Sequence, residues 1–199
     1  MKVGRMNKLS VCVYCGSRPG AQSEYADAAR SMGAEIGRRG WQLVYGGGRA
    51  GLMGIVADAA LAAGAPVVGV IPESLMGREL GHRGLTELHV VQTMHERKLM
   101  MAERSDAFVA LPGGIGTFEE MFEVWSWRQL GYHDKPLGLL NVAGYYDTLL
   151  SFLLESERQG LMTNEQLALL QVRNEPLALL DELGRLAPLA TAPDDYRRI

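Results

Sequence analysis

Residues 112–120 bring glycines, a hydroxyl and two carboxylates together in one short segment, which reads Pro-Gly-Gly-Ile-Gly-Thr-Phe-Glu-Glu. Glycine lets the backbone approach a phosphate closely, and free N–H groups at the start of a helix point toward such an anion. A carboxylate one turn later, Glu120, would lie beside the bound group. There it could stabilise a developing positive charge or accept a proton. The segment therefore predicts a phosphate site with an acidic side chain next to it.

A structural explanation for the same carboxylate has to be weighed. Thr117-Phe118-Glu119-Glu120 has the spacing of a capping box, in which a threonine hydroxyl and a carboxylate three residues later satisfy backbone donors at a helix start. Capping alone would account for Glu120. It would not account for the glycines that precede Thr117, and a ligand-binding loop explains both features.

The second charged element is Met94-His95-Glu96-Arg97-Lys98. Met94, Arg97 and Met101 share one stripe of a helix, so Arg97 would project from a face that is otherwise apolar. A cation there needs a partner, because an unpaired charge is costly to bury. The candidates are a ligand phosphate or Glu120, and the alternative is a surface arginine that caps the helix or pairs with Glu96.

Two more glycine-rich turns follow apolar runs, at residues 15–20 and 46–54. Turns of this kind gather at the carboxyl ends of the strands in an open α/β sheet, where ligands bind. Gly46, Gly48 and Gly51 also spell G-x-G-x-x-G, with Glu73 downstream, which keeps a dinucleotide-dependent enzyme open as an alternative. No P-loop with Lys and Ser or Thr is present, so nucleoside triphosphate hydrolysis is disfavoured.

The elements that must position these residues can be read from hydrophobic runs. Apolar runs at 10–14, 42–45, 66–71, 107–111 and 136–140 are each followed by glycine or proline and a stretch compatible with helix. Runs without polar alternation are typical of strands covered on both faces. We therefore expect an α/β fold: a doubly wound, Rossmann-like parallel sheet with helices on both faces, in a single domain with its core at about 9–185. The expected helices are 24–39, 52–63, 94–104, 118–130 and 145–156, with one or two outer helices in 164–184 and a frayed tail at 187–199.

Composition excludes several classes of function. Over 199 residues, 23 acidic and 20 basic residues leave a net charge of −3, which would not attract nucleic acid or an anionic membrane surface. No apolar run approaches the length of a membrane span. The four histidines show no metal-ligand spacing, and Cys12 and Cys15 would point to opposite faces of a strand, so no metal and no disulfide are expected. Two buried thiols are typical of a reducing cytoplasm.

The same residues carry a resemblance to a known family. Residues 112–120 match the P-G-G-x-G-T-x-x-E signature of the Lonely Guy family of cytokinin riboside monophosphate phosphoribohydrolases, once misnamed lysine decarboxylases, and residues 94–98 resemble its M-x-x-R-K element. The similarity extends from about residue 10 to 161, including 46–54 and 125–136. A decarboxylase would need a lysine poised to form a pyridoxal Schiff base, and no such site is recognisable.

The resemblance implies a hydrolase that cuts the N-glycosidic bond of AMP or an N6-substituted AMP, without a cofactor, and that forms a homodimer. Arg97 and Glu120 would be the catalytic residues. The other implied contacts with the nucleoside monophosphate are Glu79, Met94, Lys98, Gly113, Gly114, Ile115, Gly116, Thr117 and Glu119, together with Gly16, Ser17, Gly47 and Gly48 from the other two glycine turns. Helix 118–130, apolar on more than one side, is the candidate dimer contact. A nucleotide or molybdenum-cofactor carrier is the alternative, because such carriers share a similar loop and sheet but could dispense with the Arg97–Glu120 pair.

Overall fold

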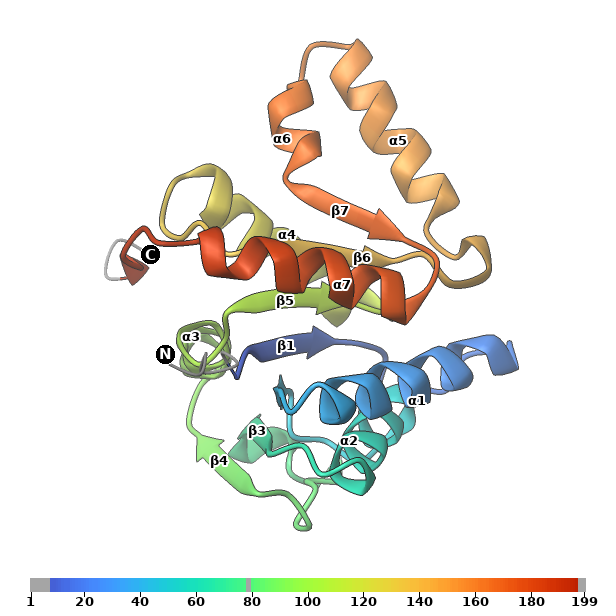
Figure 1. Ribbon diagram of the computed structural model, residues 1–199, viewed down its shortest axis with the longest axis vertical. Coiled ribbons are helices and arrows are strands. Elements are labelled where there is room, and N and C mark those ends of the chain that lie inside the picture. Colours follow the sequence, from blue (N-terminus) through green and yellow to red (C-terminus); the bar gives the residue numbers. More distant parts are fainter. Residues whose placement is uncertain (1–7, 78–79, 197–199) are drawn as a thin grey trace, which may run out of the picture.

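The computed structural model describes residues 8–77 and 80–196. A parallel seven-stranded sheet in the order β4-β3-β2-β1-β5-β6-β7 forms its centre, with helices packed on both faces (Figure 1). The strands are β1 Ser10–Tyr14, β2 Gln42–Tyr45, β3 Val67–Pro72, β4 Glu87–Val91, β5 Ala107–Ala110, β6 Leu137–Leu140 and β7 Leu170–Arg173. The α-helices are α1 Ser23–Arg38, α2 Gly51–Ala62, α3 Met94–Glu103, α4 Ile115–Gln129, α5 Asp147–Arg158, α6 Asn164–Ala168 and α7 Pro176–Leu186. The doubly wound α/β architecture expected from the sequence is confirmed.

Two hydrophobic cores lie on opposite faces of the sheet, and β1 contributes to both. Val11 and Val13 belong to the core covered by α1, α2 and α7, whereas Cys12 and Tyr14 belong to the core covered by α3, α4 and α5. Successive side chains of a strand point to opposite faces. A strand buried on both sides is therefore apolar along nearly its whole length, as the runs in the sequence predicted.

The two edge strands were not predicted. β4 carries Glu87 and His89, and β7 carries Gln171 and Arg173, so neither strand has the uninterrupted apolar run of the central strands. β7 lies between α6 and α7, in the segment for which only helices were expected. Edge strands contact a neighbour on one side only, which allows polar residues within them.

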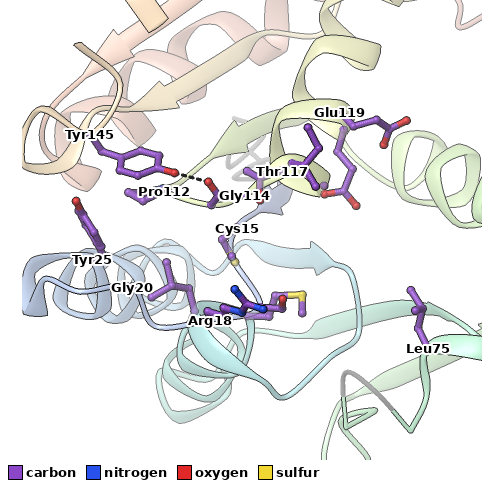
Figure 2. Close-up of a pocket in the computed structure, with 18 of the residues that line it drawn as sticks. Cys15, Arg18, Gly20, Tyr25, Leu75, Pro112, Gly114, Thr117, Glu119 and Tyr145 are labelled. Atoms are coloured by element: carbon purple, nitrogen blue, oxygen red, sulfur yellow. Dashed lines mark hydrogen bonds between the residues drawn. The ribbon is translucent and has the colours of Figure 1, made fainter. Parts of the chain in front are cut away.

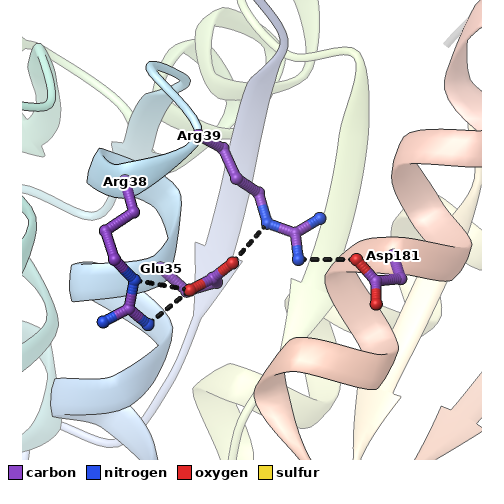
Figure 3. A network of polar contacts seen from close by, with 4 residues as sticks. All are labelled: Glu35, Arg38, Arg39 and Asp181. Atoms are coloured by element: carbon purple, nitrogen blue, oxygen red, sulfur yellow. Dashed lines mark hydrogen bonds and ion pairs between the residues drawn. The ribbon is translucent and has the colours of Figure 1, made fainter.

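Polar contacts join the carboxyl end of α1 to α7, on the sheet face that α1, α2 and α7 cover. The Arg39 guanidinium donates from Nε to Glu35 (2.8 Å) and from a terminal nitrogen to Asp181 (2.7 Å) (Figure 3). This arginine also lies over the ring of Trp41, 5.1 Å from its centre. The contacts tie the carboxyl end of α1 to α7, which lies beside it in Figure 1.

Part of the tail for which the sequence predicts fraying is packed. Tyr196 is 9% exposed and its ring lies 5.8 Å from that of Trp127. Lys135 donates to the Tyr196 hydroxyl (3.2 Å) and pairs with Asp194 (2.6 Å). These contacts order the segment up to residue 196, and sequence composition alone does not reveal them.

The strand order reverses between β1 and β5. From β1 the chain proceeds toward β2, β3 and β4, and from β5 it proceeds toward β6 and β7. The loops after β1 and β5 therefore diverge and leave a crevice at the carboxyl ends of these strands, which is where open α/β sheets bind ligands. Within 8–77 and 80–196, no helix has the length and apolar character needed to cross a membrane.

Candidate active site

A cavity of about 580 Å³ lies at this crevice. Its volume falls within the range of small-molecule sites. In Figure 2, Gly114 and Thr117 form one wall and Arg18 lies on the opposite wall, while Tyr25 and Tyr145 stand at one end and Leu75 at the other. The sequence-predicted residues that line it are Gly16, Ser17, Met94, Arg97, Gly113, Gly114, Ile115, Gly116, Thr117, Glu119 and Glu120.

Helix α4 begins at Ile115, three residues before the start at residue 118 that the sequence pattern indicates. Gly114 is the N-cap and makes no side-chain capping bond. Phe118 N donates to Gly114 O (3.1 Å), so Thr117 already lies in the first turn and the predicted Thr117–Glu120 capping box is wrong. Capping therefore does not explain Glu120, which is 9% exposed and lines the cavity.

The glycines of this loop differ in whether the protein's own packing requires glycine at their positions. A Cβ at Gly113 would lie 2.1 Å from Thr117 Oγ1, so the packing of the loop itself excludes a side chain there. A Cβ at Gly114 or Gly116 would meet no atom of the protein within 4 Å. Neither glycine has a positive φ. Packing and backbone conformation therefore give no reason for glycine at these two positions, whereas a ligand close to the backbone does.

Arg97 is held by the main chain of the sheet. Its guanidinium is buried, with Nε donating to Val70 O (3.1 Å) and a terminal nitrogen donating to Gly46 O (2.9 Å), at β3 and just beyond β2. A Cβ at Gly46 would lie 2.0 Å from the same terminal nitrogen, so Gly46 makes room for the cation. Glu96 instead forms a capping box with Thr93 at the start of α3. The alternative of a surface arginine at position 97 is wrong.

The thiol in the cavity wall is not a nucleophile. Burial raises the pKa of Cys15 far above its usual range and that of Cys12 to about 12, so both stay protonated at neutral pH. Cys15 and Cys12 also belong to different cores, on opposite faces of the sheet. Among the residues that the structure describes, the ionisable side chains left to act in the cavity are carboxylates, arginines and tyrosines.

The chain is similar in sequence to cytokinin riboside 5'-monophosphate phosphoribohydrolases. It is 47% identical over 178 residues to the probable enzyme LOGL2 of Oryza sativa subsp. japonica (89% of this chain, 73% of the relative). It is 54% identical over 160 residues to the enzyme of Rhodococcoides fascians (80% and 81%). The chain belongs to the Lonely Guy family. The family model described as "Possible lysine decarboxylase" matches residues 53–183, although no lysine lines the cavity in the described part of the chain.

The solved structures that resemble this Lonely Guy chain support its fold. The molybdenum cofactor binding protein of Rippkaea orientalis superposes with a TM-score of 0.70 at 21% identity, covering 92% of this chain and 99% of that one. The molybdenum cofactor carrier protein of Chlamydomonas reinhardtii gives 0.68 at 19% identity, covering 92% and 99%. At such identities the likeness concerns the fold alone.

Some residues implied by the Lonely Guy motifs lie outside the cavity. Lys98 binds Glu119 (2.5 Å) and Glu123 (2.8 Å); burial disfavours its charge, but these hydrogen bonds outweigh that effect and raise its pKa. Gly47 and Gly48 are buried within the second glycine turn, and a Cβ at Gly47 would lie 3.1 Å from Ile71. Lys98 therefore joins α3 to α4, and Gly47 serves packing. Glu79 lies outside the described residues.

Other cavity residues were missed by the sequence reasoning. Arg18 belongs to the first glycine turn and lines the cavity, and a cationic residue in a glycine-rich turn is a pattern that indicates an anion site. Tyr25 and Tyr145 come from α1 and from the segment before α5, and no local pattern connects them with the loop. The Tyr145 hydroxyl donates to Gly113 O, as the dashed line in Figure 2 shows. Among the described residues, no group of His, Cys, Asp and Glu side chains is arranged to hold a metal ion.

Proposed function

We propose that this chain hydrolyses the N-glycosidic bond of AMP or of an N6-substituted AMP, releasing the free base and ribose 5-phosphate. The observation that carries the proposal is that Glu120 and Arg97 line the same cavity as the open glycines at the start of α4. The sequence relation to phosphoribohydrolases supports the same reaction.

The 5'-phosphate would bind at the start of α4. The first N–H groups of a helix have no partner within it, and the helix dipole favours an anion there. Ile115, Gly116 and Thr117 supply these N–H groups, and Thr117 adds a hydroxyl. The open space at Gly114 and Gly116 lets a phosphate approach the backbone closely.

The sugar would then lie beside Glu120. As the bond between C1' and the base nitrogen breaks, its electron pair leaves with the base and positive charge develops on the ribose. Glu120 stabilises that charge, orients the water that attacks C1' and accepts a proton from it. The departing base takes up a proton from solvent at the nitrogen that loses the bond, and Glu120 returns its proton to solvent, so the net change is the addition of one water molecule. A guanidinium is a poor general acid, so proton donation is not the role of Arg97. Its fixed guanidinium instead orients the substrate and stabilises charge.

The test is base release, followed by chromatography, from AMP and from its N6-isopentenyl analogue. Glu120→Gln keeps the size of the side chain and removes its charge. It should fold like the parent and lose about 10²- to 10⁴-fold in kcat. Cleavage at the parent rate by this variant would overturn the role of Glu120. Tight nucleotide binding by the parent without base release would instead favour a carrier.

We also propose that the chain acts as a homodimer in the cytoplasm. Phe122 of α4 is 38% exposed, and Phe152 and Leu154 of α5 are 65% and 57% exposed, as expected of helices that meet a partner. Light scattering should give about twice the chain mass of 21.7 kDa. The buried free thiols Cys12 and Cys15 are consistent with a reducing compartment.

A further inference from the structure

The backbone of Arg18 is fixed between two elements of the cavity. In the loop after β1, Gly16 N donates to Pro112 O (3.1 Å) and Gly16 O accepts from Leu52 N (3.0 Å). At the start of α2, Gly51 has φ +59°, and a Cβ there would lie 2.3 Å from Arg18 N. The loop is therefore held against both the phosphate loop and α2, which sets the position of Arg18 relative to the start of α4.

The side chain of Arg18 has no internal partner in the part of the chain that the structure describes. The other charged groups of the cavity are engaged: Arg97 donates to two main-chain carbonyls, and Glu119 binds Lys98. Arg18 makes no hydrogen bond, ion pair or ring contact with 8–77 or 80–196. Arg18 lies on the cavity wall opposite the start of α4 (Figure 2), where the helix dipole has its positive end.

The Arg18 guanidinium and the start of α4 are both positive and lie on opposite walls of the cavity, an arrangement that suits an anion bound between them. The start of a helix carries about half an elementary charge, whereas a phosphate monoester carries about −1.5 to −2 near neutral pH. The helix alone therefore leaves about one negative charge or more without compensation. One guanidinium on the opposite wall supplies that charge, and its fork of N–H donors matches phosphate oxygens.

We infer that Arg18 is a second contact for the 5'-phosphate and that it sets the preference for the nucleoside monophosphate over the nucleoside. The inference rests on the proposed function, in which the phosphate lies at the start of α4. It assigns the first glycine turn a direct part in substrate recognition, because that turn carries a charged side chain into the cavity.

The first test compares Arg18→Gln and Arg18→Lys with the parent. Arg18→Gln should raise the KM for AMP by about 10- to 100-fold with little change in kcat, because the contact is to a group that does not react. Arg18→Lys should fall between the two, because it keeps the charge and loses the fork. Arg49→Gln is the matched control: Arg49 lies in the second glycine turn, exposed, outside the cavity residues and without a side-chain partner in the described part. It should behave like the parent.

The second test measures ribose 5-phosphate binding by calorimetry at two salt concentrations. Arg18→Gln should bind about 10- to 100-fold more weakly than the parent and lose part of the salt dependence. An unchanged affinity and KM in Arg18→Gln, with a parent that cleaves AMP, would overturn the role of Arg18 alone. A parent that binds ribose 5-phosphate through Arg18 but releases no base would overturn the proposed hydrolysis and leave the phosphate contact standing. Arg18 is exposed, so melting temperatures of the variants should match the parent.

Discussion

Replacing Gly116 by alanine should stabilise the protein and damage substrate binding at the same time. Gly116 is the second residue of α4, has no positive φ, and a Cβ there would meet no protein atom within 4 Å. Alanine in a helix is more favourable than glycine by about 0.5–1 kcal/mol. For a chain of this size, that gain corresponds to a rise in melting temperature of about 1–4 °C.

The same methyl group should hinder the phosphate. In a helix each Cα–Cβ bond tilts toward the helix start, so the new group would enter the space in which the anion is proposed to lie. Loss of one hydrogen bond to a charged group costs about 1.5–3 kcal/mol, or about 10- to 100-fold in kcat/KM. The assay pairs a thermal melt with initial rates of AMP cleavage over a range of concentrations.

Gly113→Ala provides the contrast, because a Cβ there would lie 2.1 Å from Thr117 Oγ1 and 2.9 Å from Gly16 N. It should lower stability by about 1–3 kcal/mol through overpacking. A Gly116→Ala variant that melts higher and keeps the parent kcat/KM would refute the placement of the phosphate at the start of α4. A variant that melts lower would refute the claim that Gly116 has no packing role.

Three further outcomes follow from contacts described above. Arg97→Ala should lower both activity and stability, the latter by about 1–3 kcal/mol, because the carbonyls of Gly46 and Val70 lose their buried donor; a thermal melt alongside the rate assay checks this, and an unchanged melt would contradict it. Tyr145→Phe should raise the KM for AMP by about 2- to 10-fold with kcat little changed, because the Gly113 carbonyl loses its hydroxyl donor; steady-state kinetics test it, and a change confined to kcat would argue against a role in holding the loop. Burial lowers the pKa of His133 from 6.5 to about 4, so the neutral side chain contributes fully to stability above pH 6.5, and this contribution falls as the pH drops toward 4. Urea unfolding should therefore show the free energy of unfolding falling by about 2 kcal/mol between pH 6.5 and 5, and the His133→Gln variant should not show this loss.

The central strands were predicted well from the sequence because their burial on both faces restricts them to apolar residues. β1, β2, β3, β5 and β6 are covered on both faces, so apart from the half-buried first residues Ser10 and Gln42 their positions are apolar and the runs stand out. β4 and β7 escaped because an edge strand tolerates residues such as Glu87 and Arg173. The start of α4 was misplaced because Thr117 has the spacing of a cap, while the actual cap, Gly114, makes no side-chain bond that a pattern could predict.

The site was predictable as far as local sequence encodes it. The glycine loop and the residues one turn beyond it are contiguous, so their proximity follows from the chain itself. Arg97 lies 23 residues before Glu120, and the parallel topology brings both to one crevice. Tyr25 and Tyr145 reach the cavity by tertiary packing, with ring centres 5.5 Å apart, and nothing in their local sequence indicates this. Gly47 shows the converse: it belongs to a glycine-rich turn, yet it does not line the cavity. Its φ of +76° and the 3.1 Å that would separate a Cβ there from Ile71 account for glycine at this position.

The attachment of Arg97 to main-chain oxygens bears on how such an enzyme can diversify. The acceptors at Gly46 and Val70 are peptide carbonyls, so their presence does not depend on which side chains surround them. Substitutions elsewhere around the cavity, at Leu75 or Met53 for example, would change the shape of the cavity while the guanidinium stays in register with the strands. The position of the guanidinium is therefore set by the sheet backbone and not by the side chains that shape the cavity. Gly46 is the exception, because a Cβ at this position would displace the guanidinium.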